Sequence, residues 1–353
     1  MLSDSPTARL DIDLSALLAN YRTLQKRAGS AEVAPVVKAD AYGLGCAGVA
    51  PHLVKHGAQT FFVARLEEGI ALRGILAGGP VIYVLDGLSD PVAFAVHDLR
   101  PVVNTVAQYQ QWISGPVGIK AALHIDTGMN RLGVRPEEIA ALPGRGAHDL
   151  TLVMSHLACG DEAGHPMNAQ QLTAFRAVAA QFPGIPASLA NSAGHFLGAD
   201  YSLDLTRPGI CLYGGGPFGQ ATPHLRAVAT LSARVLQVRD VRAGETIGYG
   251  ATFAAKADMR VATVGVGYAD GLMRSFARKG FAHVAHHQQP LTGRISMDLC
   301  GLDVTGLDVT VNDWVEILGP RQNIDEVADL SGTIAYELLT RIAARVPRRY
   351  LAS

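Results

Sequence analysis

The sequence predicts an α/β protein, with an N-terminal (β/α)8 TIM-type barrel followed by a mostly antiparallel β C-terminal domain. Three observations support this prediction. Eight short apolar runs rich in β-branched residues recur between residues 33 and 213, and helix-like segments separate them; spacings of roughly 20 to 35 residues are typical of consecutive βα units. Polar residues follow several of these runs where they end. Beyond residue 223 strand-like runs continue without long helices between them, which favours antiparallel strands.

The composition is that of a globular protein with a small-molecule partner. The 353 residues are 48% hydrophobic and 17% charged, which is enough for one large domain and a smaller one. Lys and Arg number 30 and Asp and Glu number 31. This balance gives no indication of a nucleic-acid partner.

The cysteines and the N-terminus favour a cytoplasmic protein. Cys46, Cys159, Cys211 and Cys300 lie far apart without a CxxC pair, which argues against a disulfide framework or a structural zinc site. The first residues carry no signal-peptide pattern, and no window has about 18 uninterrupted apolar residues. We therefore expect a protein that is neither exported nor embedded in a membrane.

Local signals define the elements in order. Asp13 is the expected N-cap of a helix with leucines at helical spacing, and Gly29 is its expected end. The expected barrel strands are 33–37, 60–64, 81–85, 101–104, 121–126, 152–155, 187–191 and 209–213. The expected elements of the second domain are strands at 227–238, 260–266, 281–285 and 314–318 and helices at 323–330 and 333–345.

A glycine-rich stretch at 214–222 interrupts this pattern and marks a domain boundary. We therefore expect the barrel to comprise residues 10–216. The β-rich domain is expected at 223–353, with residues 1–9 as a segment that could join it.

The stretch Pro35-Val36-Val37-Lys38-Ala39-Asp40-Ala41-Tyr42-Gly43-Leu44-Gly45 carries the first chemical signal. A valine-rich run that ends in Lys38 and continues into small residues indicates a buried strand leading into a tight turn. A lysine at the mouth of such a strand is suited to form a Schiff base. From this stretch alone, a lysine that extends its ammonium out to solvent is an equal alternative.

Polar residues follow other expected strands in the same way. Asp126-Thr127-Gly128, Ser155-His156, Asn191-Ser192 and Arg207 all stand at strand ends, where barrel enzymes carry their chemistry. The small residues after Asn191, with the Ser192 hydroxyl, are suited to surround a phosphate. Each turn alone is also common in ordinary loops, so it is their combination with Lys38 that indicates a site.

Two further features concern an arginine and a tyrosine. Arg131 lies between two glycines soon after a strand end, suited to a carboxylate or a phenolate, with a surface arginine as the alternative. Tyr249, flanked by Gly248 and Gly250, has a hydroxyl free for acid or base work if its pKa is lowered, and is otherwise a packed turn residue.

We expect no metal site. His283, His286 and His287 flank an expected hairpin without acidic or cysteine partners in register. They are therefore interpreted as residues at an exposed strand end.

These motifs, in this order and across nearly the whole chain, resemble the alanine racemase family, pyridoxal-phosphate enzymes with an N-terminal barrel and a C-terminal β-domain. The resemblance implies interconversion of L- and D-alanine, which supplies D-alanine for peptidoglycan. It also implies a homodimer with active sites shared between subunits.

The resemblance also implies roles for individual residues. Lys38 would form the Schiff base and serve as one catalytic base, and Tyr249 would be the second base, acting in the other subunit's site. The cofactor phosphate would be held by positions matching Tyr42, Ser192, Gly209, Ile210 and Tyr336, with Asn191 beside Ser192. Arg207 would face the pyridine nitrogen, and His156 would bond to Arg207 and Tyr249. Arg131 would contact the cofactor's phenolic oxygen and the substrate, and Met297 would contact the substrate through its backbone.

The chemistry agrees with these roles. An amino acid joined to pyridoxal phosphate has an acidic α-proton, so a base on each face of the planar intermediate can remove and return a proton. A protonated Arg207 disfavours a proton on the pyridine nitrogen of the cofactor. It therefore limits how strongly the cofactor ring withdraws electrons from the α-carbon.

One position departs from the family pattern. Many members carry a lysine, often carbamylated, seven residues before the arginine that matches Arg131, and this sequence has His124 there. We hypothesise that His124, or an anion beside it, orients Arg131 without a carbamate. A carbamate on a nearby lysine such as Lys120, visible in intact mass, would contradict this hypothesis.

Two other functions remain open from the sequence. A serine or broad-specificity amino-acid racemase would use the same chemistry with a different pocket. A non-enzymatic pyridoxal-phosphate carrier would share the barrel, but such carriers resemble the first domain alone, and the second domain with Tyr249 argues against that function.

Overall fold

The structure, a computed structural model, describes residues 6–351, whose contacts divide the chain into two compact units. One unit comprises Leu18–Leu212, and the other combines the residues up to Leu17 with those from Tyr213 onward. The N-terminal boundary therefore differs from the expected one at residue 10. Strand β1 (Ala8–Asp13) pairs with β10 (Ala229–Val241) and with β18 (Arg348–Leu351), so its hydrogen bonds tie it to the second unit.

Helix α1 (Leu14–Ala28) begins and ends where the sequence predicts. The Asp13 carboxylate accepts hydrogen bonds from the backbone N–H groups of Ser15 at 2.8 Å and Ala16 at 2.9 Å, as an N-cap does. Gly29 follows the helix with a φ of 67°, a left-handed conformation that glycine adopts at little cost.

The first unit is a barrel of short parallel strands. These are β2 (Glu32–Val33), β3 (Thr60–Val63), β4 (Val81–Val84), β5 (Arg100–Val103), β6 (Ala121–His124), β7 (Leu150–Met154), β8 (Ala187–Ser188) and β9 (Leu205–Thr206). Strands β3 to β8 pair in chain order, and β2 pairs with β9. A bridge between Val36 and Phe62 joins β2 to β3, and the Arg207 N–H bonds to the Ala190 carbonyl at 2.8 Å beside β8. These links close the predicted ring.

The last barrel strand corrects the sequence prediction. It is Leu205–Thr206 rather than 209–213, and Ile210–Tyr213 forms a 3-10 turn instead. Pro208 has no N–H to offer a strand ladder, and the apolar residues after it are buried within the turn. Arg207 therefore stands directly after a strand, like the other polar residues of the predicted site.

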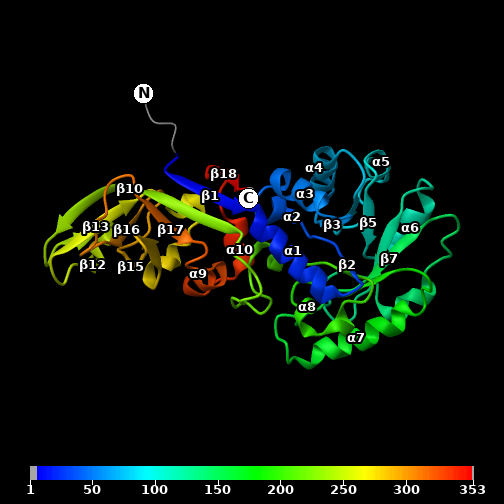
Figure 1. The fold of residues 1–353 in the computed structure, drawn as a ribbon. Helices are drawn as coiled ribbons and strands as arrows, with labels where there is room; N and C mark the ends of the chain where they lie inside the picture. Colours follow the sequence, from blue (N-terminus) through cyan, green and yellow to red (C-terminus); the bar gives the residue numbers. More distant parts are fainter. Residues whose placement is uncertain (1–5, 352–353) are drawn as a thin grey trace. The chain divides into compact units, whose positions relative to one another are not determined.

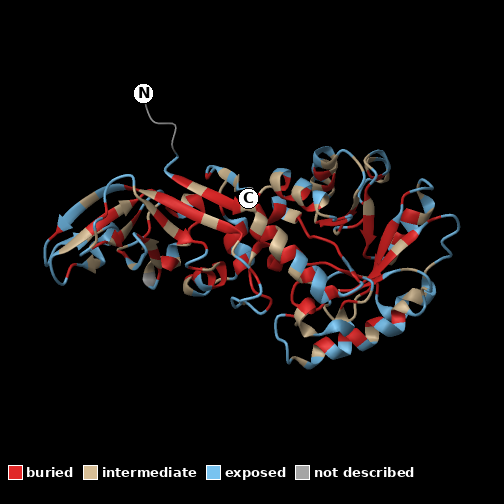
Figure 2. Ribbon diagram, in the orientation of Figure 1, coloured by how far each residue is buried: buried red, intermediate tan, exposed pale blue. Residues whose placement is uncertain are grey.

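Helices surround this barrel. They are α2 (Lys38–Tyr42), α3 (Cys46–Lys55), α4 (Leu66–Leu76), α5 (Pro91–Val96), α6 (Val106–Ser114), α7 (Pro166–Ala179) and α8 (Gly194–Leu197). Helices α3 to α5 lie along one side of the strands and α7 along another (Figure 1). The strands are mostly buried, whereas α7 exposes its outer face (Figure 2).

Aromatic rings fill part of the barrel interior. The rings of Phe62 and Tyr83 stack with centroids 5.0 Å apart, and the Arg207 guanidinium lies 5.8 Å from the Phe62 centroid. The interior is therefore a packed core, as in other barrels of this type.

The second unit is built on an eight-stranded sheet in the order β13-β16-β15-β14-β17-β10-β1-β18. Its remaining strands are β13 (Met259–Val264), β14 (Phe281–Val284), β15 (His287–Thr292), β16 (Cys300–Asp303) and β17 (Trp314–Leu318). A further pairing of β10 with β13 closes six of these strands on themselves. Among the strands that the structure describes in this unit, β1 and β18 are the one parallel pair, which confirms the mostly antiparallel domain.

The C-terminal helices are shorter than expected. Helix α9 (Ile324–Ser331) begins at its Asn323 cap, and α10 (Ala335–Thr340) ends five residues before the predicted end at 345. Residues 341–346 are instead mostly turns and bends, and Arg345 among them forms an ion pair with Asp270 at 2.7 Å. None of the helices described between residues 6 and 351 is long and apolar enough to cross a membrane.

Candidate active site

The chain makes a left-handed turn directly after Lys38. The φ angles of Ala39, Asp40, Ala41 and Tyr42 lie between 51° and 56°, a conformation that non-glycine residues seldom adopt in succession. Lys38 itself is half-buried. Burial lowers the pKa of its amine, and the Arg131 charge lowers it further, while the Glu68 and Asp86 carboxylates act in the opposite sense. The amine is therefore easier to deprotonate than that of an exposed lysine.

Tyr42, Ser192 and Gly209 converge on one point of the barrel mouth. A Cβ atom on Gly209 would lie 2.1 Å from the Tyr42 hydroxyl. The Ser192 hydroxyl accepts hydrogen bonds from the backbone N–H groups of Gly209 at 2.9 Å and Cys211 at 3.3 Å. Ile210 begins a 3-10 turn, so its N–H has no acceptor within the turn. Hydroxyl and backbone N–H donors gathered in this way are suited to bind a phosphate.

We predict that Gly209→Ala destabilises the protein. The added methyl group has no space beside the Tyr42 ring, and overpacking of this kind typically costs about 1–3 kcal/mol of unfolding free energy. Thermal unfolding measures the effect, and Gly164→Ala is the matched control because a Cβ there would meet nothing within 4 Å. Equal losses of stability in the two variants would contradict the predicted clash.

Arg207 is buried without a carboxylate partner in the described chain. One terminal nitrogen donates to the Ser188 hydroxyl and the other to the Ser155 carbonyl. Its Nε donates to no acceptor among residues 6–351. Burial lowers the pKa of the guanidinium to about 9, so it is still positively charged at neutral pH. Its free Nε–H can therefore serve a ligand in the barrel mouth.

His156 stands beside Arg207 in a buried polar network. Its Nδ1 lies 3.5 Å from an Arg207 terminal nitrogen, and burial together with the Arg207 charge holds the pKa of the imidazole well below 6.5. The Gln171 side chain donates to the His156 carbonyl at 2.9 Å and to the Thr127 hydroxyl at 3.2 Å. Gln171 was not predicted from the sequence, because a glutamine within α7 has no local feature that distinguishes it.

Asn104 determines which ring nitrogen of His124 carries the proton. The Asn104 amide nitrogen donates to the carbonyl oxygens of Leu85 at 2.8 Å and Val102 at 2.9 Å, which turns its oxygen toward His124 Nδ1, 2.8 Å away. Nδ1 therefore carries the proton, and Nε2 is left as a hydrogen-bond acceptor. Burial, followed by the Arg207 charge, lowers the pKa of His124 to about 4, so this imidazole is neutral at pH 7.

We predict a pH-dependent contribution of His124 to stability. Between pH 6.5 and 4 the unfolded chain binds a proton at this residue and the folded chain does not, so stability falls as the pH falls through this window. His124→Gln should reduce the slope of unfolding free energy against pH by up to about 1.4 kcal/mol per pH unit. Denaturant unfolding at several pH values measures it, with the exposed His224→Gln as control. Parallel curves for wild type and His124→Gln would contradict the assignment.

The loop after β6 presents Arg131. Asp126 accepts hydrogen bonds from the N–H groups of Gly128 at 2.9 Å and Asn130 at 3.1 Å, and Val134 donates to the His124 carbonyl at 2.8 Å. Arg131 is exposed on this loop, yet its charge lowers the pKa values of Lys38, His124 and His156. It therefore belongs to the same electrostatic cluster.

Asn191 holds the turn that carries Ser192. Its side-chain oxygen accepts a hydrogen bond from the Gly194 N–H at 3.0 Å. This contact supports a role for Asn191 in shaping the predicted phosphate turn.

Tyr249, Met297 and Tyr336 belong to the other unit. Tyr249 is 72% exposed on a 3-10 turn (Tyr249–Ala251), between Gly248 and Gly250 with φ angles of 75° and 73°. Met297 is 54% exposed, and its carbonyl accepts a hydrogen bond from the Ala269 N–H at 2.9 Å. Tyr336 lies on α10 and is partly exposed. The Tyr249 side chain is therefore exposed on a turn between two glycines rather than packed within it.

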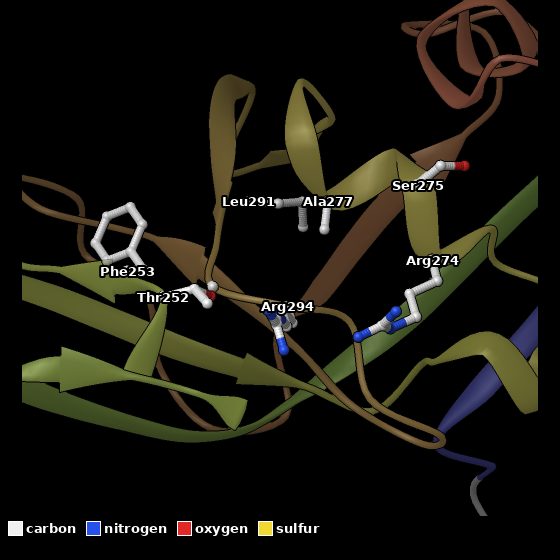
Figure 3. A pocket seen from close by; sticks show the side chains of 8 residues that line it. Thr252, Phe253, Arg274, Ser275, Ala277, Leu291 and Arg294 are labelled. Atoms are coloured by element: carbon white, nitrogen blue, oxygen red, sulfur yellow. The ribbon is translucent and has the colours of Figure 1, made fainter. Parts of the chain in front are cut away.

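A pocket of about 600 Å³ in this unit lies near the Tyr249 turn. Figure 3 shows Arg274 and Arg294 around the same space as Thr252 and Phe253. Arg294 also borders the Tyr249 turn, because a Cβ on Gly250 would lie 3.0 Å from its guanidinium. Two guanidinium groups in one pocket favour an anionic ligand.

A closed parallel barrel with a half-buried lysine, a buried arginine and a cluster of hydroxyl and N–H groups at one end is the arrangement of a barrel enzyme that uses a phosphate-bearing cofactor. Residues 12–217 match the family model "Alanine racemase, N-terminal domain", and residues 228–350 match "Alanine racemase, C-terminal domain". The chain therefore belongs to the alanine racemase family.

Individual relatives agree. The alanine racemase of Rhizobium meliloti is 46% identical over 98% of this chain and 97% of its own length, and that of Rhodospirillum rubrum is 44% identical over 98% and 96%. The crystal structure of alanine racemase from Bartonella henselae with covalently bound pyridoxal phosphate matches with a TM-score of 0.92 at 37% identity, covering 98% of this chain and all of that one. The biosynthetic alanine racemase of Pseudomonas aeruginosa matches with a TM-score of 0.91 at 34% identity, over 99% and 100%.

Proposed function

We propose that this protein is a pyridoxal-phosphate-dependent racemase that interconverts L- and D-alanine. The observation that carries the proposal is the placement of Lys38 within a barrel mouth that also holds the Tyr42, Ser192 and Gly209 donors and the Arg207 guanidinium, in a chain that matches both family domains. D-alanine is the form that bacteria build into peptidoglycan, so supply of D-alanine for the cell wall is the proposed role.

The residues present fit pyridoxal phosphate. The donors around Gly209 would hold the phosphate, and Tyr336 is proposed as a further phosphate ligand. The Arg207 Nε–H would face the ring nitrogen. The group opposite this nitrogen would therefore be a cation and not a carboxylate. Arg131, with His124 Nε2 as a neutral acceptor for its guanidinium, would contact the phenolic oxygen and the substrate carboxylate. Lys38 would hold the cofactor covalently.

Proton transfer is the task of this chain's own side chains. When bound, pyridoxal phosphate withdraws electrons from the α-carbon of the amino acid and makes its proton acidic. The Lys38 amine, with its pKa lowered by burial, would take or return that proton on one face. The Tyr249 hydroxyl would do so on the other face. His156 is neutral, and its Nδ1 faces the Arg207 guanidinium as an acceptor, so its Nε2–H would donate the hydrogen bond that orients the Tyr249 oxygen.

We propose a homodimer in which Tyr249 and Met297 complete the site of the other subunit. Support comes from the exposure of Tyr249, Met297 and Leu299. Tyr249 and Leu299 also line a groove of about 510 Å³ at the Tyr249 turn. Exposed apolar side chains around a reactive hydroxyl fit a surface that another copy covers.

The proposed compartment is the cytoplasm. Cys46, Cys159, Cys211 and Cys300 are all unpaired, which fits a reducing environment. Besides a second copy of the chain, the proposed binding partner is the substrate, a free amino acid.

Substrate choice is tested by comparing turnover of L-alanine, L-serine and L-lysine under the same conditions. We expect the highest kcat/KM for alanine. Faster racemisation of serine or lysine would replace the proposal with a serine or broad-specificity racemase, and cofactor binding without turnover of any amino acid would leave a non-enzymatic carrier.

A further inference from the structure

The turn that follows Lys38 is strained and has to be held by its surroundings. Four successive residues, Ala39 to Tyr42, are left-handed, and none of them is glycine or asparagine. Such a conformation costs roughly 1–2 kcal/mol per residue. Strain of this kind persists where neighbouring contacts determine the backbone.

Backbone hydrogen bonds hold much of the turn, and the first of them runs from the Ala41 N–H to the Val37 carbonyl at 2.9 Å. Gly43 donates to the Ala39 carbonyl at 2.8 Å, and Gly45 donates to the Asp40 carbonyl at 2.8 Å. The N–H of Ala39, the peptide directly after Lys38, has its acceptor elsewhere in the chain. It donates to a Glu68 carboxylate oxygen at 2.7 Å, across 29 residues of sequence.

Glu68 connects this peptide to the end of strand β3. Its second carboxylate oxygen accepts hydrogen bonds from the N–H groups of Ala64 at 2.8 Å and Arg65 at 3.2 Å. A capping box at the start of α4 explains the Arg65 contact alone. That contact is the longest of the three, and the two shorter ones join elements outside the helix.

We propose that Glu68 is a positioning residue for Lys38, whose carboxylate anchors the Ala39 peptide to β3 and thereby fixes the direction of the lysine side chain. This inference rests on the proposed function, in which Lys38 holds the cofactor and transfers the α-proton. A carboxylate suits the role because both of its oxygens accept, whereas an amide offers one acceptor and would turn a donor toward an N–H group. Its negative charge also favours the protonated form of Lys38 and raises the pKa of that amine against the effect of burial.

The test compares Glu68→Gln with Glu67→Gln. Glu67 lies on the same turn of α4 and is exposed, so it is matched in position and charge. We expect Glu68→Gln to lower kcat by about 10- to 100-fold, because misplacement of a reacting group by about 1 Å can cost a factor of 100, with a smaller change in KM. Glu67→Gln should match wild type.

A second readout uses the enzyme stripped of cofactor. The rate at which the Lys38 amine reacts with trinitrobenzenesulfonate, located by peptide mass mapping, reports its titration. When this rate is plotted against pH, Glu68→Gln should shift the midpoint of the curve to lower pH. Glu67→Gln should leave the midpoint unchanged. Wild-type kcat and midpoint in Glu68→Gln, or equal losses in both variants, would overturn the proposal.

Glu68→Asp keeps the test decisive if Glu68→Gln does not fold. It retains the charge but withdraws the carboxylate from Ala39, so kcat should fall while the midpoint moves less than in Glu68→Gln. An unchanged kcat in Glu68→Asp would overturn the positioning role. A wild-type protein without racemase activity would contradict the proposed function instead, and the titration of Lys38 would still test the effect of Glu68 on it.

Discussion

Replacing Lys38 with alanine is expected to abolish both racemisation and the covalent attachment of pyridoxal phosphate. Lys38 is half-buried, and both burial and the Arg131 charge lower the pKa of its amine. The Lys38 charge in turn lowers the pKa of His156 in the barrel mouth. Loss of a residue that both holds the cofactor and transfers a proton should reduce kcat by at least about 1,000-fold. Racemisation is followed by optical rotation, and attachment by intact mass after borohydride reduction.

Lys55→Ala is the control for this result. Lys55 is exposed at the end of α3, so its removal should change neither property. Attachment of the cofactor to Lys38→Ala at wild-type stoichiometry would show that another lysine holds it and would remove Lys38 from the centre of the mechanism.

Tyr249→Phe is expected to abolish most racemisation while leaving the cofactor bound. The substitution removes one oxygen atom from an exposed side chain, so folding should be unaffected. Removal of a general acid or base typically costs about 100- to 10,000-fold in rate. Tyr201→Phe, a half-buried tyrosine in the barrel unit, is the control. Undiminished turnover in Tyr249→Phe would exclude this hydroxyl as a base.

A mixture of the two inactive variants tests whether the sites are shared. In a hybrid dimer of Lys38→Ala and Tyr249→Phe, one site would combine an intact Lys38 with an intact Tyr249 from the other subunit. Random exchange makes about half of the dimers hybrid, each with one competent site of two, so activity should return to about a quarter of wild type. No recovery after verified subunit exchange would contradict sharing.

The sequence predicted the parts of the fold that depend on local pattern. Asp13 and Gly29 delimit α1 because capping is a property of neighbouring residues. The last barrel strand was misplaced because the run at 209–213 has the apolar composition of a strand, whereas pairing with β2 selects Leu205–Thr206. The sequence places residues 10–13 in the barrel, whereas they belong to β1 of the second unit, because the partners of this strand, β10 and β18, lie far away in the sequence.

The same distinction separates the site residues. Lys38 and Arg207 are unusual residue types beside expected strands, and their combination with the other polar turns indicates a site. Glu68, Gln171 and Asn104 act in the site through contacts with residues 15 to 44 positions away, which the sequence pattern does not show. The left-handed turn after Lys38 contradicts the local preferences of its residues, and only tertiary contacts explain it.

The most direct test of the proposed reaction is incubation of the holoenzyme with L-alanine in deuterium oxide. Two bases on opposite faces of the α-carbon should cause optical rotation to decay to zero while deuterium enters the α-position of alanine. Unchanged rotation, or loss of rotation without deuterium at the α-carbon, would contradict the account.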